Sequence, residues 1–495
     1  MGKSVSRHLA VCFALAATFA VPTLCEAQTA AQKGVLRAGA AKVDITPPLQ
    51  AMSNGWPETL RDHLYVRAIV LDNGATRAAL INADQGGMTD AIWNDASKRL
   101  ATELQCPVEN VFISAIHTHS DGGGFSRNMT LPGTQPPGGR GQGQPQTPGG
   151  QPQAAGRGQG PAPDGAPSVA DAIVKAVQLA KEKLQPAVIG FGTGNVYLNV
   201  NRDAVNPQSK LWYQGPNVNA PSDKTISIVT LKTPSGDPIA VYFNYAMHPI
   251  NYYLTGIVSA DFPGETAADI ESYYGDKVIA VFTQSASGDQ NPLYLQPHGD
   301  LTAALRGRKA GGPPLGQDPA DPNAKPDLGA VKEATANLDQ MVKAEGQIIS
   351  QEILRVMQHT DNFSGEVRIW GGAKTIECPG RTRTDSGREG MQGQYVDGAP
   401  LHIRLGLITV GPIAFGGVNA EVYNEIWLRL KSESPLRNSM MVTLTDGNAG
   451  SGYIPNDESF SHNTFEVIGS RLKPGCAEDG IVNGILGLMS DSLKQ

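Results

Sequence analysis

Two histidines separated by one residue are the first side chains in this chain that could do chemistry. His117 and His119 follow residues 111–115, a hydrophobic run typical of a β-strand. In an extended chain, residues two apart project to the same side, so both imidazoles would face one cleft. The glycines at 122–124 would allow close approach of a ligand. The pair indicates a metal or catalytic element; two satisfied polar histidines at a strand end are the alternative.

Polar side chains follow three further predicted strands in the same way. They are His248 after residues 240–245, Asp289 after residues 278–282, and Glu421 after residues 413–415. Open α/β sheets place their sites at the carboxyl ends of strands, so these side chains are expected to meet. Imidazoles and a carboxylate suit Zn²⁺ with an open coordination position, which activates water and polarises a carbonyl. The pattern predicts hydrolytic chemistry, whereas each residue alone is more typical of a structural role.

Strand-like and helix-like segments alternate around these residues. Strands are predicted at 66–71, 78–81, 111–113, 226–229, 240–243, 278–282 and 413–415, and helices at 90–104, 171–184, 338–356 and 421–430. An Asn73-Gly74 turn separates the first two strands. Alternation of this kind predicts α/β layering.

The composition limits the classes to which this chain can belong. It has 495 residues, and 40 Lys and Arg against 47 Asp and Glu give a net charge of −7. A nucleic-acid-binding surface needs clustered basic residues, so no nucleic-acid partner is expected. After the N-terminal segment, no apolar run reaches the roughly 20 residues that span a bilayer. Residues 131–167 repeat Gly, Pro and Gln and are expected to form a disordered insertion, which alone would suggest a structural envelope protein.

The N-terminal segment and the cysteines bear on the cellular compartment in which the protein works. Residues 1–27 combine a cationic start, an apolar stretch and a small residue at Ala27, the pattern of a cleavable signal peptide. The protein is therefore expected to be secreted or periplasmic, with an N-terminal membrane anchor as the alternative. The remaining cysteines, Cys106, Cys378 and Cys476, allow at most one disulfide, and the sequence does not decide which pair forms it.

Several motifs, in their order along the chain, resemble the neutral/alkaline (non-lysosomal) ceramidase family. They are residues 36–47, His117-Thr118-His119-Ser120, Ser287-Gly288-Asp289 and Glu421, and the resemblance spans roughly residues 36–466. It implies that residues 28–495 form a single large catalytic domain, an α/β fold with a mixed β-sheet core flanked by helices. It also implies one zinc ion and a small-molecule or lipid acyl-amide substrate, and it leaves contact with a membrane surface open.

The resemblance also implies roles for individual residues. The metal ligands would be His117, His248, Glu421 and Tyr453. His119 would be the catalytic histidine beside the metal, and Arg202 would hold the substrate or its oxyanion. Three aspartates are expected to orient the ligating groups: Asp84, Asp261 and Asp289. For Asp84 and Asp261, a turn or helix cap is an equal alternative.

Three departures from the family pattern affect the mechanism. Asn291 stands where the family has its nucleophilic serine, Phe465 replaces a further tyrosine, and the family's C-terminal immunoglobulin-like domain is not expected here. An amide is no nucleophile but can donate to an oxyanion. We therefore expect attack by metal-activated water, with His119 as general base and with Arg202 and Asn291 stabilising the oxyanion. Ser285 or Ser287 as a displaced nucleophile, and a metal-containing binding protein without activity, are the alternatives.

Overall fold

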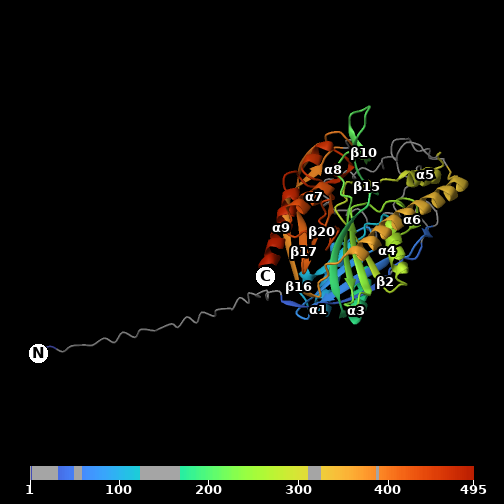
Figure 1. Cartoon of the computed structure of the whole chain (residues 1–495). Coiled ribbons are helices and arrows are strands. Elements are labelled where there is room, and N and C mark those ends of the chain that lie inside the picture. Colours follow the sequence, from blue (N-terminus) through green and yellow to red (C-terminus); the bar gives the residue numbers. More distant parts are fainter. Residues whose placement is uncertain (1, 3–31, 50–57, 123–167, 310–324, 386–388) are drawn as a thin grey trace. The chain divides into compact units, whose positions relative to one another are not determined.

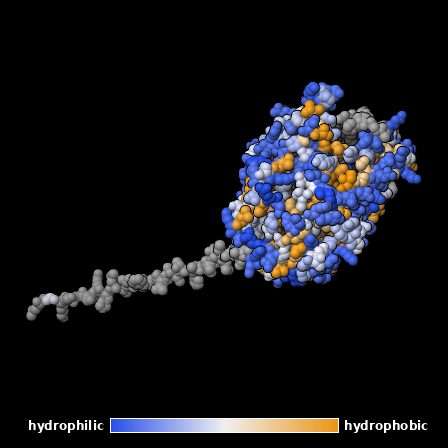
Figure 2. Space-filling model, viewed as in Figure 1, coloured by the Kyte–Doolittle hydropathy of each residue, from blue (hydrophilic) through white to orange (hydrophobic). Residues whose placement is uncertain are grey.

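The computed structural model of the chain describes residue 2 and residues 32–49, 58–122, 168–309, 325–385 and 389–495. Residues 31–495 form one compact unit. The predicted signal peptide and the Gly/Pro/Gln insertion lie outside the described residues. None of the described helices is both long and apolar enough to cross a bilayer. One face of the molecule is mostly hydrophilic, with smaller hydrophobic patches between the polar side chains (Figure 2).

The first sheet has five strands in the order β6-β5-β4-β2-β7. Their bounds are β2 (Arg37–Asp44), β4 (Tyr65–Asp72), β5 (Arg77–Ala83), β6 (Val111–Ala115) and β7 (Gln185–Pro186). The strands β5 and β6 are parallel and are connected through α1 (Asp90–Leu104) and the short η1 (Val108–Asn110), whereas the other neighbours are antiparallel. The helix α3 (Val169–Glu182) packs on β2 and β4.

The second sheet has four strands in the order β14-β12-β11-β8. Their bounds are β8 (Val188–Asn195), β11 (Thr225–Lys232), β12 (Pro238–Tyr245) and β14 (Ile279–Gln284). The parallel strands β12 and β14 are connected through α4 (Asp261–Tyr273). The long helix α6 (Leu328–His359) packs on α4 and on α5 (Gln296–Leu305).

The third sheet has five strands in the order β1-β16-β17-β18-β20. Their bounds are β1 (Lys33–Val35), β16 (Glu366–Arg383), β17 (Tyr395–Val410), β18 (Ile413–Val418) and β20 (Asn438–Thr443). The parallel strands β18 and β20 are connected through α7 (Asn424–Glu433), and α9 (Ala477–Lys494) packs on β16 and β17. A disulfide between Cys378 and Cys476 joins β16 to the start of α9.

The side chains on the two faces of each sheet show how the sheets and helices are layered. In β4, Val66, Ala68 and Val70 belong to one hydrophobic core with residues of α1, α3, α4 and α6, while Ile69 and Leu71 belong to another with residues of the third sheet such as Phe415. The opposite face of the third sheet packs on α7 and α9. The order is therefore helices, two sheets, the third sheet, helices (Figure 1). This confirms the predicted α/β class and mixed β-sheet core flanked by helices.

Several short strands lie outside the large sheets, and four of them, β9, β15, β19 and β21, carry site residues. They are β9 (Asn199–Val205), β10 (Trp212–Asn217) and β15 (Gln290–Pro292) in one group, β3 (Thr59–Leu60) with β13 (Ile257–Val258), and β19 (Glu421–Val422) with β21 (Tyr453–Ile454). The remaining elements are η2 (Glu458–His462) and α8 (Phe465–Gly469). The expectation that a helix begins at Glu421 is wrong, because this residue pairs as a strand with Tyr453 and the helix begins at Asn424.

Candidate metal centre

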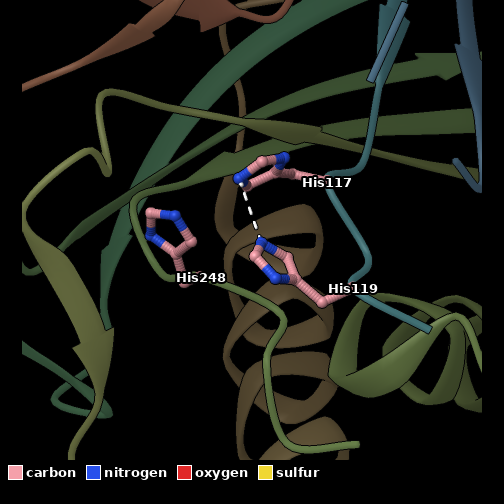
Figure 3. Close-up of side chains that lie close together, drawn as sticks. All are labelled: His117, His119 and His248. Carbon is pink, nitrogen blue, oxygen red and sulfur yellow. Dashed lines mark hydrogen bonds between the residues drawn. The ribbon is translucent and has the colours of Figure 1, made fainter. Parts of the chain in front are cut away.

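His117 lies where β6 ends, and its backbone makes a sharp turn there. Its φ is +71°, in the left-handed region that L-residues rarely adopt. Its amide donates to the Gln85 carbonyl at 3.0 Å, and its Nδ1 lies 2.6 Å from the Gly86 carbonyl oxygen. The predicted extended geometry is therefore wrong at this residue. His117 and His119 nevertheless converge, with their Nε2 atoms 3.3 Å apart (Figure 3).

His248 comes to the same place from the second sheet. It follows β12, and both its backbone amide and its Nδ1 lie near the Gln290 carbonyl oxygen, at 3.0 and 3.1 Å. The amide of His119 donates to the Pro249 carbonyl at 3.2 Å, which ties the two histidine loops together. The three imidazoles are buried, and their nitrogens lie close enough to one another to hold a metal ion.

Glu421 and Tyr453 complete the set of four predicted ligands. The Glu421 Oε2 atom lies 3.1 Å from the Nε2 of His117 and 3.3 Å from the Nε2 of His248. Tyr453 is the strand partner of Glu421, and its ring centroid lies 6.4 Å from that of His248. The structure thus brings these four distant residues into one cluster, in which the histidines and the tyrosine are buried and Glu421 is half-buried, with the tyrosine on its edge.

The orientation of the two rings shows why a cation fits this cluster. The Nδ1 atoms of His117 and His248 face the carbonyls of Gly86 and Gln290, which only accept, so each Nδ1 carries a proton. When the ring is neutral, its Nε2 atom then carries a lone pair, and the Nε2 atoms of both rings face Glu421. Burial, followed by the charge of a nearby arginine, lowers the pKa of His248 to about 4, so this ring is neutral near pH 7. A divalent cation would satisfy these facing lone pairs, and Zn²⁺ uses such donors.

The charges around the cluster separate the roles of the histidines. Burial lowers the pKa of His117, but the Glu421 carboxylate outweighs burial and the net shift is upward. Burial raises the pKa of Glu421, but the two histidines outweigh it and hold this pKa well below its usual range. Burial, together with the charges of His117 and His248, holds the pKa of His119 well below its usual range. His119 is therefore neutral and able to accept a proton.

Arg202 and Asn291 lie together beside the cluster. Nη1 of Arg202 donates to Oδ1 of Asn291 at 2.9 Å, and Nη2 donates to the Gly288 carbonyl at 2.6 Å. The guanidinium also lies over the Tyr453 ring, 5.4 Å from its centroid. The two predicted oxyanion-stabilising residues are thus in direct contact.

Asp289 supports this region rather than an imidazole. Its Oδ2 accepts from the Asn201 side chain at 2.7 Å, and its Oδ1 accepts from the Asn424 backbone at 2.8 Å. These bonds tie the loop after β14 to β9, which carries Arg202, and to the start of α7. Burial raises the pKa of Asp289 to about 7.

Among the described residues, Asp84 and Asp261 make no hydrogen bond to the imidazoles, so the expectation that they orient the ligands directly is wrong. Asp84 accepts from the Arg67 side chain and the Tyr65 amide, each at 2.8 Å. Asp261 accepts from the backbone and side chain of Asn251, each at 2.8 Å. The groups that face Nδ1 of the histidines are backbone carbonyls, and no sequence pattern reveals these.

Two neighbours of the cluster have no signal in the sequence. The Tyr253 ring stands edge-on to the His119 ring with centroids 5.1 Å apart, and the Glu466 carboxylate pairs with Arg202 at 2.6 Å. Among the described residues, no hydrogen bond joins the alternative nucleophiles Ser285 and Ser287 to a histidine, and the Gln284 side chain donates to Ser287.

Comparison with known proteins places this arrangement in a known fold. No family model matches the chain. The solved structure of neutral ceramidase from Pseudomonas aeruginosa matches with a TM-score of 0.62 at 14% identity, covering 92% of this chain and 75% of that chain. A ceramidase complexed with C2 matches with a TM-score of 0.64 at 15% identity, covering 93% and 75%. The resemblance to neutral ceramidases is therefore confirmed, and at these identities what it shows is that the chain has their fold.

Proposed function

We propose that this protein is a secreted or periplasmic zinc-dependent hydrolase that cleaves an amide bond of the N-acyl sphingoid type, or a related acyl bond. The observation that carries the proposal is the convergence of His117 Nε2, His248 Nε2 and Glu421 Oε2 in a buried cluster. The ceramidase fold supports the substrate class. The disulfide supports an oxidising compartment, where such bonds persist.

His117, His248 and Glu421 would hold the ion, with Tyr453 at the edge of the cluster as the fourth ligand. When bound, the ion supplies a Lewis acid that polarises the scissile carbonyl and lowers the pKa of water. His119 contributes a neutral imidazole beside His117, one of these proposed ligands. Its imidazole accepts the proton of the attacking water and then delivers it to the leaving nitrogen.

Asn291 and Arg202 are proposed to stabilise the oxygen that becomes negative. An amide N–H donor costs no proton transfer and acts most strongly where water is excluded. Asn291 is nearly buried, and Arg202 is 3% exposed. The Phe465 ring lies 5.9 Å from that of Tyr453 and is partly exposed, which suits an apolar group on the substrate.

The test is zinc analysis combined with a substrate panel. Purified protein is assayed with N-acylsphingosines, N-acylethanolamines, N-acyl amino acids and p-nitrophenyl esters, before and after chelation. We expect about one zinc ion per chain and turnover of at least one substrate of the panel. This activity should be lost on chelation and should recover when Zn²⁺ is added. If the protein holds a full equivalent of zinc but turns over no substrate, the result would instead support a metal-containing binding protein. The replacement of the family's serine nucleophile by Asn291 favours this alternative.

A further inference from the structure

Glu466 is a buried carboxylate beside the candidate centre that the mechanism above does not use. It is the second residue of α8, and it is 0% exposed. Its Oε1 lies 2.6 Å from Arg202 Nε, while its Oε2 has no hydrogen-bond partner among the described residues. An ion pair buried this deeply is weak evidence of stabilisation, because desolvation offsets the attraction. Its place next to the cluster suggests another role.

Arg202 connects Glu466 to Asn291. Nε lies 2.6 Å from the carboxylate as an ion pair, Nη1 donates to Asn291 and Nη2 donates to the Gly288 carbonyl, so each nitrogen of the guanidinium has a polar neighbour. A guanidinium only donates. The side-chain carbonyl of Asn291 must therefore face Arg202, and its NH₂ group must point away.

The NH₂ group of Asn291 is left available. Nδ2 makes no hydrogen bond to any described residue and is not among the fully enclosed polar atoms of that part of the chain. Asn291 directly follows Gln290, whose carbonyl faces His248, so this donor lies on the segment that helps to form the candidate centre.

We propose that Glu466 is a positioning residue: by fixing Arg202, it turns the amide of Asn291 so that Nδ2 donates to the oxyanion of the reacting acyl group. This inference rests on the proposed hydrolase function. In this role the arginine acts through Asn291, to which its Nη1 donates. The carboxylate also offsets the arginine's positive charge, which would otherwise disfavour a cation at the neighbouring histidines.

A double-mutant cycle in the full-length, zinc-loaded protein tests the proposal. The probe is N-acetylsphingosine, or p-nitrophenyl acetate if the amide is not turned over. Removing one oxyanion donor typically costs 10²- to 10³-fold, so N291A is expected to lower kcat about 100-fold. E466Q is expected to lower kcat about 10-fold in the wild-type background but less than about 2-fold in N291A, since coupled residues are not additive. KM and zinc content should stay within about 2-fold.

Two further variants separate positioning from a general structural effect. Glu271 is a matched buried carboxylate, paired with Arg67 and Lys42 away from the cluster, and E271Q should leave kcat unchanged within about 2-fold. E466D keeps the charge and replaces E466Q in the cycle if the latter does not fold. An equal loss of kcat from E466Q in both backgrounds, or no loss in the wild type, overturns the proposal.

The failure of the proposed function is distinguishable from the failure of this inference. If the wild type turns over no substrate in the panel, the hydrolase assignment fails by itself. Crystal structures of the wild type and E466Q then decide the inference. A rotated or disordered Asn291 amide in E466Q supports positioning, and an unchanged Asn291 contradicts it.

Discussion

At the residue scale, a backbone carbonyl holds the Nδ1 atom of each imidazole that is proposed to bind the metal. The Gly86 carbonyl faces Nδ1 of His117, and the Gln290 carbonyl faces Nδ1 of His248. Such partners set the tautomer and aim Nε2 at the metal. His119 has a different position, because its Nε2 faces His117 rather than Glu421.

Alanine variants of the two neighbouring histidines should therefore differ. We expect H117A to lose its zinc, because a ligand is removed, and H119A to keep about one zinc while kcat falls about 10²- to 10⁴-fold, the usual contribution of a general base. Metal analysis and kinetics on the same samples check this. H402A, at an exposed histidine, is the control. Equal loss of zinc in H117A and H119A would contradict the assignment of roles.

A second residue-scale prediction concerns stability and pH. Glu345 is buried, and burial, with Asp261 nearby, raises its pKa well above the usual range. Asn251 bridges the two carboxyls, donating to Glu345 at 2.9 Å and to Asp261 at 2.8 Å. A raised carboxyl pKa favours folding at low pH, and that contribution is lost as pH rises towards the folded-state pKa.

We therefore expect E345Q to gain stability relative to the wild type as pH rises above about 4.3, the ordinary pKa of glutamate. The difference in unfolding free energy should grow by up to about 1.4 kcal/mol per pH unit. Urea unfolding of both proteins between pH 4 and pH 8 measures it. A difference that stays constant across this range would show that Glu345 does not titrate as described.

The sequence identifies some of these residues and cannot identify others. His117, His248 and Glu421 stand after recognisable strands, so their convergence could be predicted from strand order. Tyr453 followed only from the family resemblance. Glu466 could not be predicted, because its partner Arg202 lies 264 positions away in the sequence and the pair forms only in the folded chain.

At the element scale, the positions of the strands were predictable but their partners were not. The predicted strands occur within three residues of their predicted bounds, and the helix at 90–104 has the bounds predicted. The long β16–β17 hairpin was missed. Residues 373–377 of β16 do not alternate, because residues 373–375 are all exposed, Ile376 is half-buried and Glu377 is exposed, so no period-two pattern is visible.

At the same scale, the disulfide between β16 and α9 is expected to contribute to the stability of the fold. The bond between Cys378 and Cys476 spans 98 positions and anchors α9 to β16. Cross-links that close long loops restrict the unfolded chain, so C476S should lower the unfolding free energy by about 2–4 kcal/mol with zinc content unchanged. Denaturant unfolding checks this, with C106S at the free cysteine as the control. Equal stability of C476S and C106S would contradict the bond's role.

At the scale of the whole molecule, the centre forms where all three large sheets contribute. His117 follows β6 of the first sheet, His248 follows β12 of the second, and Glu421 follows β18 of the third. No sheet alone carries the ligand set, so metal content reports on the packing of the whole unit.

Deleting residues 131–167 tests whether that unit is independent of the insertion. Gly86, Pro249 and Gln290, whose carbonyls face or bond the histidines, all lie outside it. We expect the deletion to leave one zinc per chain and to shift Tm by less than about 3 °C, as for a change of less than about 1 kcal/mol. Calorimetry and metal analysis measure both quantities. Loss of zinc would show that the segment contributes to the centre.

The central claim is that one divalent cation lies among His117, His248 and Glu421. Anomalous X-ray scattering at the zinc edge, on crystals of protein purified without added metal, tests it most directly. We expect a single peak about 2.0–2.2 Å from His117 Nε2, His248 Nε2 and a Glu421 oxygen. A zinc-free cluster in protein incubated with Zn²⁺, or a peak elsewhere in the molecule, would contradict it.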